Sequence, residues 1–417
     1  MNGLNKDTTI LNGRITVIDA LRGFALLGVV LVHMQQHYSY FGRGPFLPHE
    51  PFLAQWDEAS MWLVMNVMVS RFINIFAFLF GMSFFIQMDR AKQKGISFRG
   101  RFLWRMVILF VIGVIGSCFY SGDILSIYAV FGVILLFLDK FKNWVLILIA
   151  VLLLGGVPRM MMMGYDKLTA SPATEQVEQQ PSRPRDASVR RQAPPKPSFW
   201  RTAKNNLTFG TETKLDYQFN PGNRGYLTLA IFIFGLVVGR SRFFETLHLK
   251  KRRNWILLAG FVAGVCLTNW LIGFFPPQGN LFWMMSQGHE PSMGEVGMEV
   301  LNDVNMVLFS GMLGMAFIVL YQMKGVGKVL GVLAPYGRMG LTNYVSQSII
   351  GAFLFAMWAF GERFGAWHTT EILLLGLGVY IVQVIISKVW LTYFQYGPLE
   401  WAWRSLTYFK MQPLWKR

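Results

Sequence analysis

The sequence predicts an all-α membrane protein, a polytopic bundle of about ten transmembrane helices with both termini in the cytoplasm. The chain has 417 residues, of which 53% are hydrophobic and only 15% are charged. Apolar runs long enough to cross a bilayer recur along it, and helices keep every backbone polar group of such runs hydrogen-bonded in lipid. The formal net charge is +17, but the basic residues gather in alternate short loops, which is the pattern of membrane orientation and not of nucleic-acid binding.

The apolar runs place about ten spans along the chain. The predicted spans are residues 15–36, 62–88, 102–121, 124–139, 143–163, 225–240, 254–275, 299–322, 338–360 and 370–394. The loops after the second, fourth, sixth and eighth spans contain clustered Lys and Arg, whereas the short loops between them contain almost none. Because cytoplasmic loops hold the excess of Lys and Arg, this alternation places both termini in the cytoplasm.

The spans divide into two halves, residues 1–163 and 225–396. Between them, residues 164–224 form a predicted extracytoplasmic loop whose Pro/Gln/Arg-rich stretch cannot bury a core and is typical of a flexible linker. Residues 397–417 follow the last span, where a Gly-Pro pair and regularly spaced Trp residues predict a short interfacial helix and tail on the cytoplasmic side. We see no internal repeat.

No metal site or disulfide framework is expected. Cys118 and Cys266 both lie in apolar spans. His33 and His37 have the spacing of metal ligands on a helix, but no further Cys or His is placed to complete a site.

The first span combines an apolar surface with a polar stripe. Arg22 and His33 are eleven residues apart, so on a helix they lie within about 20° of each other, and Asp19 falls near the same stripe. Ionisable residues inside a membrane are costly and are candidates for a functional site. The alternative is that Asp19 and Arg22 pair near one membrane surface while His33 forms a hydrogen bond at the other.

Once the topology is fixed, several polar residues fall near the outer end of the bundle. We expect His33, Arg71, Asp123 and Asp303 to lie at similar depth and to converge. The alternatives are that Arg71 reaches to the outer headgroups, that Asp123 caps a helix in a tight turn, and that Asp303 belongs to a separate buried polar cluster.

A second polar set falls in the inner half. Arg22 and Arg338 predict a cationic inner mouth, which suits a phosphate-bearing cytoplasmic ligand. Asn343 and Gln347 are four residues apart on one helix face and extend this set. The alternative for these two amides is hydrogen bonding between helices, which membrane proteins use routinely.

These residues resemble a known pattern. Leu21-Arg22-Gly23, followed ten residues later by His33, resembles the Arg-x10-His signature of the membrane acyltransferase type-three family. The rest of the chain resembles the YeiB family, which has a C-terminal domain of unknown function. The resembling segments are Arg71-Phe-Ile-Asn-Ile-Phe-Ala-Phe-Leu-Phe-Gly81, Gly122-Asp-Ile-Leu125, Gly337-Arg-Met-Gly-Leu-Thr-Asn-Tyr344 with Gln347, and Gly397-Pro-Leu-Glu-Trp401 with Trp403-Arg404.

The resemblance extends to the wider transmembrane acyltransferases, including heparan-α-glucosaminide N-acetyltransferase. It implies an acyl-CoA donor that enters from the cytoplasm, a histidine near the far side, and an acceptor beyond the membrane. Many YeiB members have Asn where this chain has His33, so this sequence looks more like a competent acyltransferase than a typical member does.

The expected function is acyl transfer across a bacterial inner membrane, most simply of acetyl from acetyl-CoA to a hydroxyl or amine of an extracytoplasmic glycan or small molecule. Arg22 and Arg338, with Asn343 and Gln347 nearby, would hold the CoA phosphates at the inner mouth. The pantetheine arm would follow the polar stripe toward His33.

At the outer end, His33 would act as general base on the acceptor or, as an alternative, as an acyl-carrying nucleophile. Asp123 or Asp303 would orient the imidazole, and Arg71 would stabilise the oxyanion or bind the acceptor.

Two other classes stay open. A transporter or lipid-handling protein would use the polar stripe as a substrate path, although the inverted repeats and broken midplane helices typical of transporters are not evident. A non-catalytic membrane scaffold that keeps an acyltransferase frame would bind no CoA. The oligomeric state is not predicted.

Overall fold

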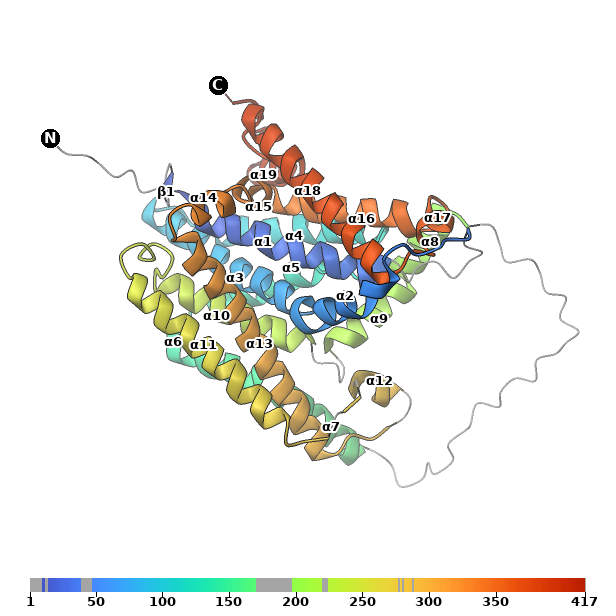
Figure 1. The fold of residues 1–417 in the computed structure, drawn as a ribbon. Helices are drawn as coiled ribbons and strands as arrows, with labels where there is room; N and C mark the ends of the chain where they lie inside the picture. Colours follow the sequence, from blue (N-terminus) through green and yellow to red (C-terminus); the bar gives the residue numbers. More distant parts are fainter. Residues whose placement is uncertain are drawn as a thin grey trace, which may run out of the picture.

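The computed structural model describes residues 10–11, 14–38, 47–169, 197–219, 224–276, 278–279, 281–286 and 289–416 (Figure 1). In this part of the chain the fold is helical, except for a two-residue antiparallel hairpin of β1 (Ile10–Leu11) and β2 (Arg14–Ile15). The predicted all-α class is therefore confirmed.

The first half begins with α1 (Thr16–Val32), which continues without a break into the π-helix η1 (His33–Tyr38). The elements that follow are η3 (Ala54–Trp56), α2 (Asp57–Leu63), the π-helix η4 (Val64–Met68), α3 (Arg71–Gln93), α4 (Arg99–Ser117), α5 (Leu125–Leu138), α6 (Asn143–Leu154) and α7 (Val157–Thr169).

The second half begins after residues 170–196, which lie outside the described part. Its elements are α8 (Phe199–Leu207), α9 (Phe209–Phe219), α10 (Arg224–Arg240), α11 (Lys251–Ile272), α12 (Leu281–Ser286), α13 (Met293–Tyr321), α14 (Val326–Gly331), α15 (Ala334–Arg338), α16 (Gly340–Phe355), α17 (Gly361–Phe364), α18 (Thr369–Tyr393) and α19 (Pro398–Tyr408).

Several of these helices are long and apolar enough to cross a membrane. Six qualify by length and composition within the described residues, and the number rises to eight if the bent pairs α6 with α7 and α8–α9 with α10 each count as one span. Each predicted span coincides with at least one helix, but α5 has only 14 residues and α16 only 16. The chain is thus a membrane protein, while the count of about ten spans and the orientation of the termini stay predictions.

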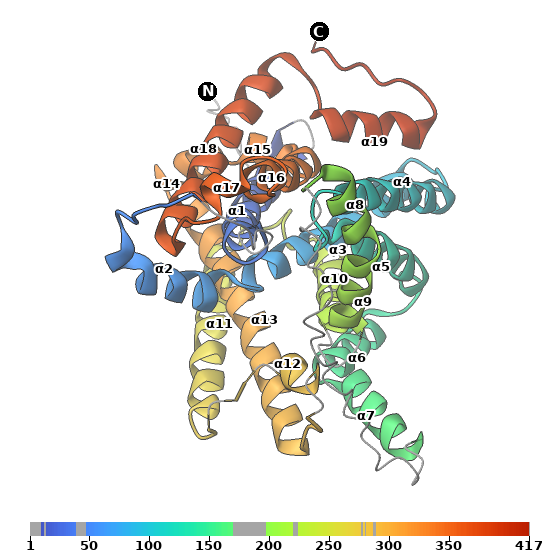
Figure 2. The ribbon, with the colours of Figure 1, turned by 90° about the vertical axis from the view of Figure 1, so that its right-hand side faces the viewer.

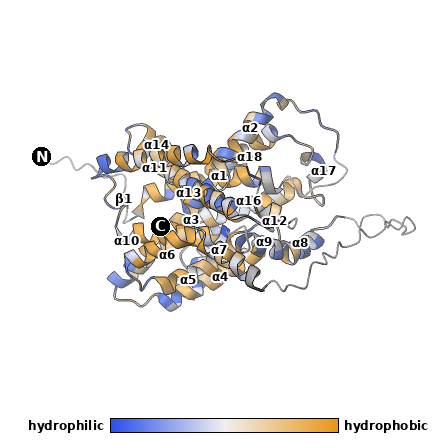
Figure 3. Ribbon diagram, turned by 90° about the horizontal axis from the view of Figure 1, so that it is seen from below, coloured by the Kyte–Doolittle hydropathy of each residue, from blue (hydrophilic) through white to orange (hydrophobic). Residues whose placement is uncertain are grey.

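The hydropathy of the surface agrees with a membrane environment. Figure 3 shows hydrophobic residues along the helices and hydrophilic residues mainly at their ends and in the loops. On α11, Trp255, Ile256 and Trp270 are more than half exposed. Aliphatic and indole groups exposed along a whole helix suit contact with lipid.

Residues 199–219 differ from the predicted linker, because they form the two helices α8 and α9. Ser198 caps α8, since its hydroxyl accepts a hydrogen bond from the Arg201 N–H at 3.3 Å. The Pro/Gln/Arg-rich stretch itself falls in residues 170–196 and lies outside the described part. In Figure 2, α8 and α9 lie against the end of the bundle at which α1 finishes.

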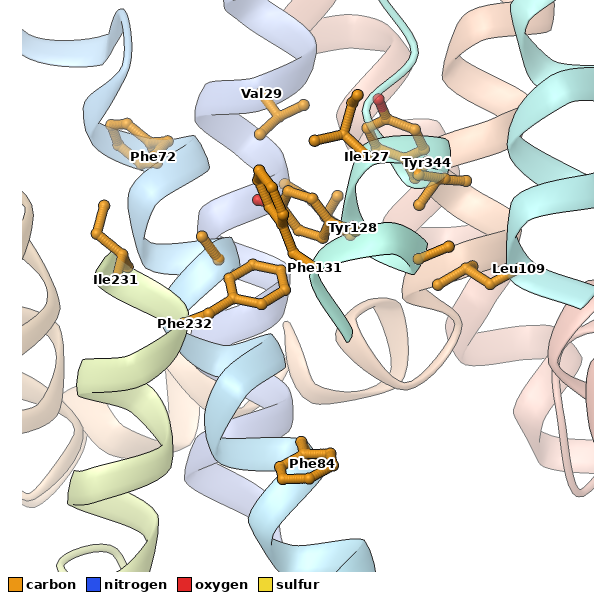
Figure 4. Packing of buried hydrophobic residues seen from close by; sticks show 14 of the residues in the cluster. Val29, Phe72, Phe84, Leu109, Ile127, Tyr128, Phe131, Ile231, Phe232 and Tyr344 are labelled. Carbon is orange, nitrogen blue, oxygen red and sulfur yellow. The ribbon is translucent and has the colours of Figure 1, made fainter. Parts of the chain in front are cut away.

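The core is built around α1, which is the most deeply buried of the candidate spans. Aromatic rings from three other helices interlock beside it (Figure 4). Tyr128 of α5 meets Phe232 of α10 edge to face at 4.8 Å, and Phe24 of α1 lies 5.0 Å from Phe72 of α3. Such pairs contribute about 0.5–1.5 kcal/mol each beyond the area that they bury.

Glycines bring the backbone of α1 into direct contact with α15. A Cβ on Gly337 would lie 1.8 Å from the carbonyl oxygen of Asp19, and a Cβ on Gly23 would lie 2.5 Å from that of Leu333. Neither position has room for a side chain. The two helices therefore cross at a separation that only glycine permits.

We expect the substitution Gly337→Ala to destabilise the protein, because its methyl group would overlap the backbone of α1 and force the helices apart. Overpacking of this kind costs about 1–3 kcal/mol. The measurement is the thermal unfolding midpoint of purified protein in detergent. Gly331→Ala is the matched control, since the nearest atom to its Cβ is the Tyr321 hydroxyl at 3.8 Å. Equal midpoints for the two variants would contradict the tight contact.

Candidate functional site

His33 lies where α1 changes from an α-helix to a π-helix. Short π-helical segments widen the helix locally and are frequent at functional sites. The side chain is only 7% exposed. Its imidazole lies between two phenol rings, with centroid distances of 5.0 Å to Tyr120 and 6.0 Å to Tyr344. His33 therefore lies in a buried, aromatic environment.

Arg22 lies at the other end of the same helix. One of its terminal nitrogens donates to Asp19 Oδ1 at 2.9 Å, and the other donates to the hydroxyl of Ser83 on α3. The predicted alternative of an Asp19–Arg22 pair is thus present. It does not remove Arg22 from a possible site, because the guanidinium also lines a cavity.

We call this space the arginine cavity. It has a volume of about 300 Å³ and is lined by residues of α1, α3, α4, α5, α15, α16, α18 and α19. Four arginines line it: Arg22, Arg105, Arg338 and Arg404. Arg22 and Arg338 belong to the predicted set, whereas Arg105 and Arg404 do not.

The charge of the arginine cavity is strongly positive. Among its described lining residues the one carboxylate is Glu400, at the start of α19. Its oxygens accept hydrogen bonds from the Leu341 N–H at 2.7 Å and from the Thr342 hydroxyl at 2.6 Å, so it anchors α19 to α16. Burial raises the pKa of Glu400, which favours its neutral form.

Two of the four arginines lie over aromatic rings. The guanidinium of Arg105 lies 4.1 Å from the centre of the Trp403 ring, and that of Arg404 lies 5.0 Å from Tyr396. Arg105 is also fixed by Trp403 through its carbonyl oxygen, which accepts from the indole N–H at 3.0 Å. These contacts hold the cations without neutralising their charge, so the cavity can bind a polyanion such as a group of phosphates.

Asn343 and Gln347 do not line the arginine cavity. The Asn343 amide donates to the Tyr336 carbonyl at 3.0 Å and to the Ser387 hydroxyl at 2.9 Å. Gln347 donates to the Tyr336 hydroxyl at 2.7 Å, which in turn donates to Gln383 at 2.9 Å. Their donors join α15, α16 and α18 to one another, so the predicted alternative of hydrogen bonding between helices is present, and ligand binding by these amides stays a prediction.

The second space, which we call the histidine cavity, has a volume of about 480 Å³. It lies at the end of the bundle at which α1 finishes. Its lining includes His33, the turn from Tyr120 to Ile124, the start of α3, and one side of α8 and α9. Of the four residues predicted to converge at the outer end, the structure brings His33 and Asp123 to this cavity.

Asp123 lies in the turn between α4 and α5, outside the spanning helices. Its Oδ2 accepts the Leu125 N–H at 3.1 Å, so the predicted alternative of a helix cap is present. Its Oδ1 is buried and has no hydrogen-bond partner in the described part of the chain. Burial raises the pKa of Asp123 to about 7, while the charge of Lys214 acts in the opposite direction. The role of Asp123 in orienting the imidazole stays a prediction.

Arg71 and Asp303 lie outside the histidine cavity, and the expectation that they meet His33 is corrected. Arg71 donates to the carbonyl oxygens of Met65 and Val69, both at 3.0 Å, because the end of the π-helix η4 leaves these acceptors open. Asp303 pairs with Arg159 at 3.3 Å, since α13 lies against the buried end of α7 there and Arg159 needs a counter-ion.

The cations of the histidine cavity are instead Lys214 of α9 and Arg224 of α10, neither of which belongs to the predicted set. Arg224 donates to Asn74 Oδ1 at 2.6 Å. The Lys214 ammonium donates to the hydroxyls of Ser117 and Ser126 at 3.4 and 3.2 Å. The Ser198 cap before an aromatic-rich stretch is the signal that could have revealed the helices bearing Lys214.

Aromatic side chains connect the linings of the two cavities. Tyr344 lines the arginine cavity, yet its hydroxyl accepts the N–H of Ile124, a residue of the histidine cavity, at 3.2 Å. Phe76 stacks on both Tyr344 and Tyr128, at 6.4 and 6.2 Å. We call Phe76, Tyr128 and Tyr344 the aromatic partition.

Comparison with known proteins gives family resemblance but no activity. Residues 238–410 match the family model described as "Protein of unknown function (DUF418)". The whole chain is 27% identical to the uncharacterised protein YxaH of Bacillus subtilis, with 98% of each chain covered. It is 25% identical to an uncharacterised 39.9 kDa protein of Bacillus acidopullulyticus, again with 98% of each chain covered.

The uncharacterised protein YeiB of Escherichia coli is 24% identical, over 94% of this chain and 96% of its own length. Together with the family match, this similarity supports an assignment to the YeiB/DUF418 family. The matched residues 238–410 include Arg338, Arg404 and Tyr344, whereas Arg22 and His33 lie outside them.

The raised pKa of Asp123 has a consequence for stability. The folded protein keeps a proton on this carboxyl up to a pH of about 7, whereas an unfolded chain releases it near the ordinary value of 3.8. Stability is therefore lost as the pH rises from the unfolded pKa of this group to its folded pKa.

We expect Asp123→Asn, which keeps the capping oxygen, to remove this loss. The measurement is the thermal unfolding midpoint of both proteins at pH 5.5 and pH 8. The unfolding midpoint of the variant, compared with that of the wild type, should be higher at pH 8 than at pH 5.5. A difference between the two proteins that does not change with pH would show that Asp123 is ionised in the folded state throughout.

Proposed function

We propose that the protein is a membrane-bound acyltransferase that moves an acyl group, most simply acetyl, from acyl-CoA in the arginine cavity to a hydroxyl or amine in the histidine cavity. The proposal rests chiefly on one observation: α1 borders both cavities, with Arg22 in the first and His33 in the second. The helical rise separates the two residues by about 16 Å. This distance is of the order that the pantetheine arm of CoA needs.

The donor side follows from the charge of the arginine cavity. CoA bears several phosphates, and guanidinium groups bind phosphate in bidentate fashion. Arg22, Arg105, Arg338 and Arg404 would neutralise them, and they outnumber the one carboxyl of the described lining, Glu400. In this proposal the arginine cavity faces the cytoplasm of a bacterium, where acyl-CoA is found, and the histidine cavity faces away from it.

The reaction itself is assigned to His33. Its imidazole would accept the proton of the acceptor hydroxyl or amine as that oxygen or nitrogen attacks the thioester carbonyl. The carbon–sulfur bond then breaks, and the proton returns to the CoA thiolate. Asp123, in the same cavity, would orient the imidazole, and its ionised form would stabilise the protonated imidazole. Arg71 and Asp303 have no part in this scheme, since their partners lie elsewhere.

The test separates binding of the donor from transfer. We expect His33→Ala to lower the rate of acetyl-CoA consumption by about 10²–10⁴-fold with little change in acetyl-CoA affinity, because the imidazole acts on the reacting atoms and not on the phosphates. Arg404→Gln should instead weaken acetyl-CoA binding by about ten-fold, the value of a lost charge-assisted hydrogen bond. Both are measured with purified protein in detergent, by calorimetric titration and by release of the CoA thiol.

Arg252→Gln is the control, because Arg252 is exposed on α11 and lines neither cavity. It removes the same charge without touching the site. Absence of acetyl-CoA binding to the wild type would overturn the proposal in favour of a transporter or scaffold. Unchanged turnover in His33→Ala would overturn the role of the histidine.

The aromatic partition generates a separate expectation. If the acyl group crosses between the cavities, Tyr344 keeps water from the thioester until the acceptor is present. Tyr344→Ala should then raise acetyl-CoA hydrolysis several-fold in the absence of any acceptor. Tyr344→Phe, which keeps the ring and loses only the bond from the Ile124 N–H, should stay near the wild-type rate. Equal hydrolysis by both variants and the wild type would place the crossing point elsewhere.

A further inference from the structure

The helices α8 and α9 form one wall of the histidine cavity. Asn205, Thr213, Lys214 and Gln218 are among the residues that line it from these two helices. Their side chains offer amide, hydroxyl and ammonium groups, whereas the wall formed by α1 is mostly aliphatic. The polar contacts available to a ligand in this cavity therefore come chiefly from α8 and α9.

The charge of this cavity is not balanced. Neither Lys214 nor Arg224 has a carboxylate oxygen within 4.0 Å among the described residues. The oxygens that Lys214 contacts, on Ser117, Ser126 and the Asp123 backbone, are all neutral.

The other titratable groups in the lining do not supply the missing negative charge. They are His33, Tyr120, Tyr217 and Asp123, and Asp123 is the one carboxyl among them. Burial keeps Asp123 partly protonated near neutral pH. Asp303 lies outside the lining, where it attracts Arg224 but is ion-paired with Arg159. Two half-buried cations therefore share little negative charge, so the cavity favours a negatively charged occupant.

An unused acceptor points in the same direction. Gln218 is 8% exposed, and its Oε1 has no hydrogen-bond partner in the described part of the chain. A buried amide oxygen without a partner loses the free energy of a hydrogen bond, which a ligand hydroxyl or amine in the cavity would restore. The cavity thus presents two cations for an anion and one free acceptor for a donor.

We propose that the histidine cavity binds an acceptor that bears a carboxylate or phosphate beside its hydroxyl groups, with Lys214 and Arg224 facing the anion and Gln218 accepting a hydroxyl. Only the role of this ligand as an acyl acceptor rests on the proposed function. Its binding to the cavity does not. The inference makes α8 and α9 the elements that select the acceptor. An acidic sugar has the required chemistry.

The experiment measures binding of three small probes to purified protein in detergent at matched ionic strength: glucose, glucuronate and glucose 6-phosphate. We expect at least one of the two anionic probes to bind about ten-fold more tightly than glucose. Lys214→Gln and Arg224→Gln should each remove most of this preference. Equal binding of glucose and both anionic probes to the wild type would overturn the inference, whatever the variants do.

Lys204→Gln is the matched control, because Lys204 is exposed on α8 and does not line the cavity. Loss of the preference in this variant as well would assign it to surface charge and overturn the inference. Lys214→Arg keeps the cation and should keep the preference, which separates the role of charge from that of anchoring α9. If the anionic probes bind and acetyl-CoA does not, the anion site is supported and the proposal of acyl transfer is overturned.

Discussion

The backbone contact between α1 and α15 is the constraint on which both cavities depend. Gly23 and Gly337 leave no space for a Cβ, and Tyr380 of α18 donates to the Gly23 carbonyl at 2.9 Å beside the crossing. Arg22 and Arg338 are the neighbours of these two glycines in sequence, so the close approach of the backbones itself brings both guanidinium groups to one cavity. Because α1 runs on unbroken into η1, fixing its first turns also fixes where His33 lies.

The sequence analysis placed residues along each helix and left their lateral neighbours undetermined. Hydrophobic length and the alternation of basic loops determine how far along a helix a residue lies, which is why His33 and Asp123 were expected at one end and Arg22 and Arg338 at the other. Depth does not say which helices are neighbours. Arg71 and Asp303 share the expected depth with His33, yet one takes the open carbonyls of η4 and the other pairs with Arg159. Neither partner could be chosen before the packing was known.

The residues that were missed share another cause. A long loop is interpreted mainly from its composition. Because of its Pro/Gln/Arg-rich stretch, the whole loop was predicted to be a linker, including the helical segment that bears Lys214. Arg105 was not among the predicted site residues, although the Trp403 ring holds it at the cavity. Asn343 and Gln347 are the opposite case, because they were predicted to bind a ligand, and in the structure they join helices. In an apolar medium a polar side chain is as valuable for joining helices as for binding a ligand, and spacing along one helix cannot distinguish the two uses.

The arrangement of α1 also bears on the choice between transfer and transport. Alternating access moves one half of a transporter against the other around a central site. Here α1 packs against α3 of the first half and against α15, α16 and α18 of the second, and the Gly23–Gly337 crossing joins the halves through their backbones. Rocking would have to break this contact. In the proposed transfer, the acyl group would pass the aromatic partition by rotamer changes at Tyr344 and its neighbours, and the packing of α1 would stay intact. The Gly23–Gly337 contact is the reason that we propose transfer between two fixed compartments and not movement of a substrate through a rocking bundle.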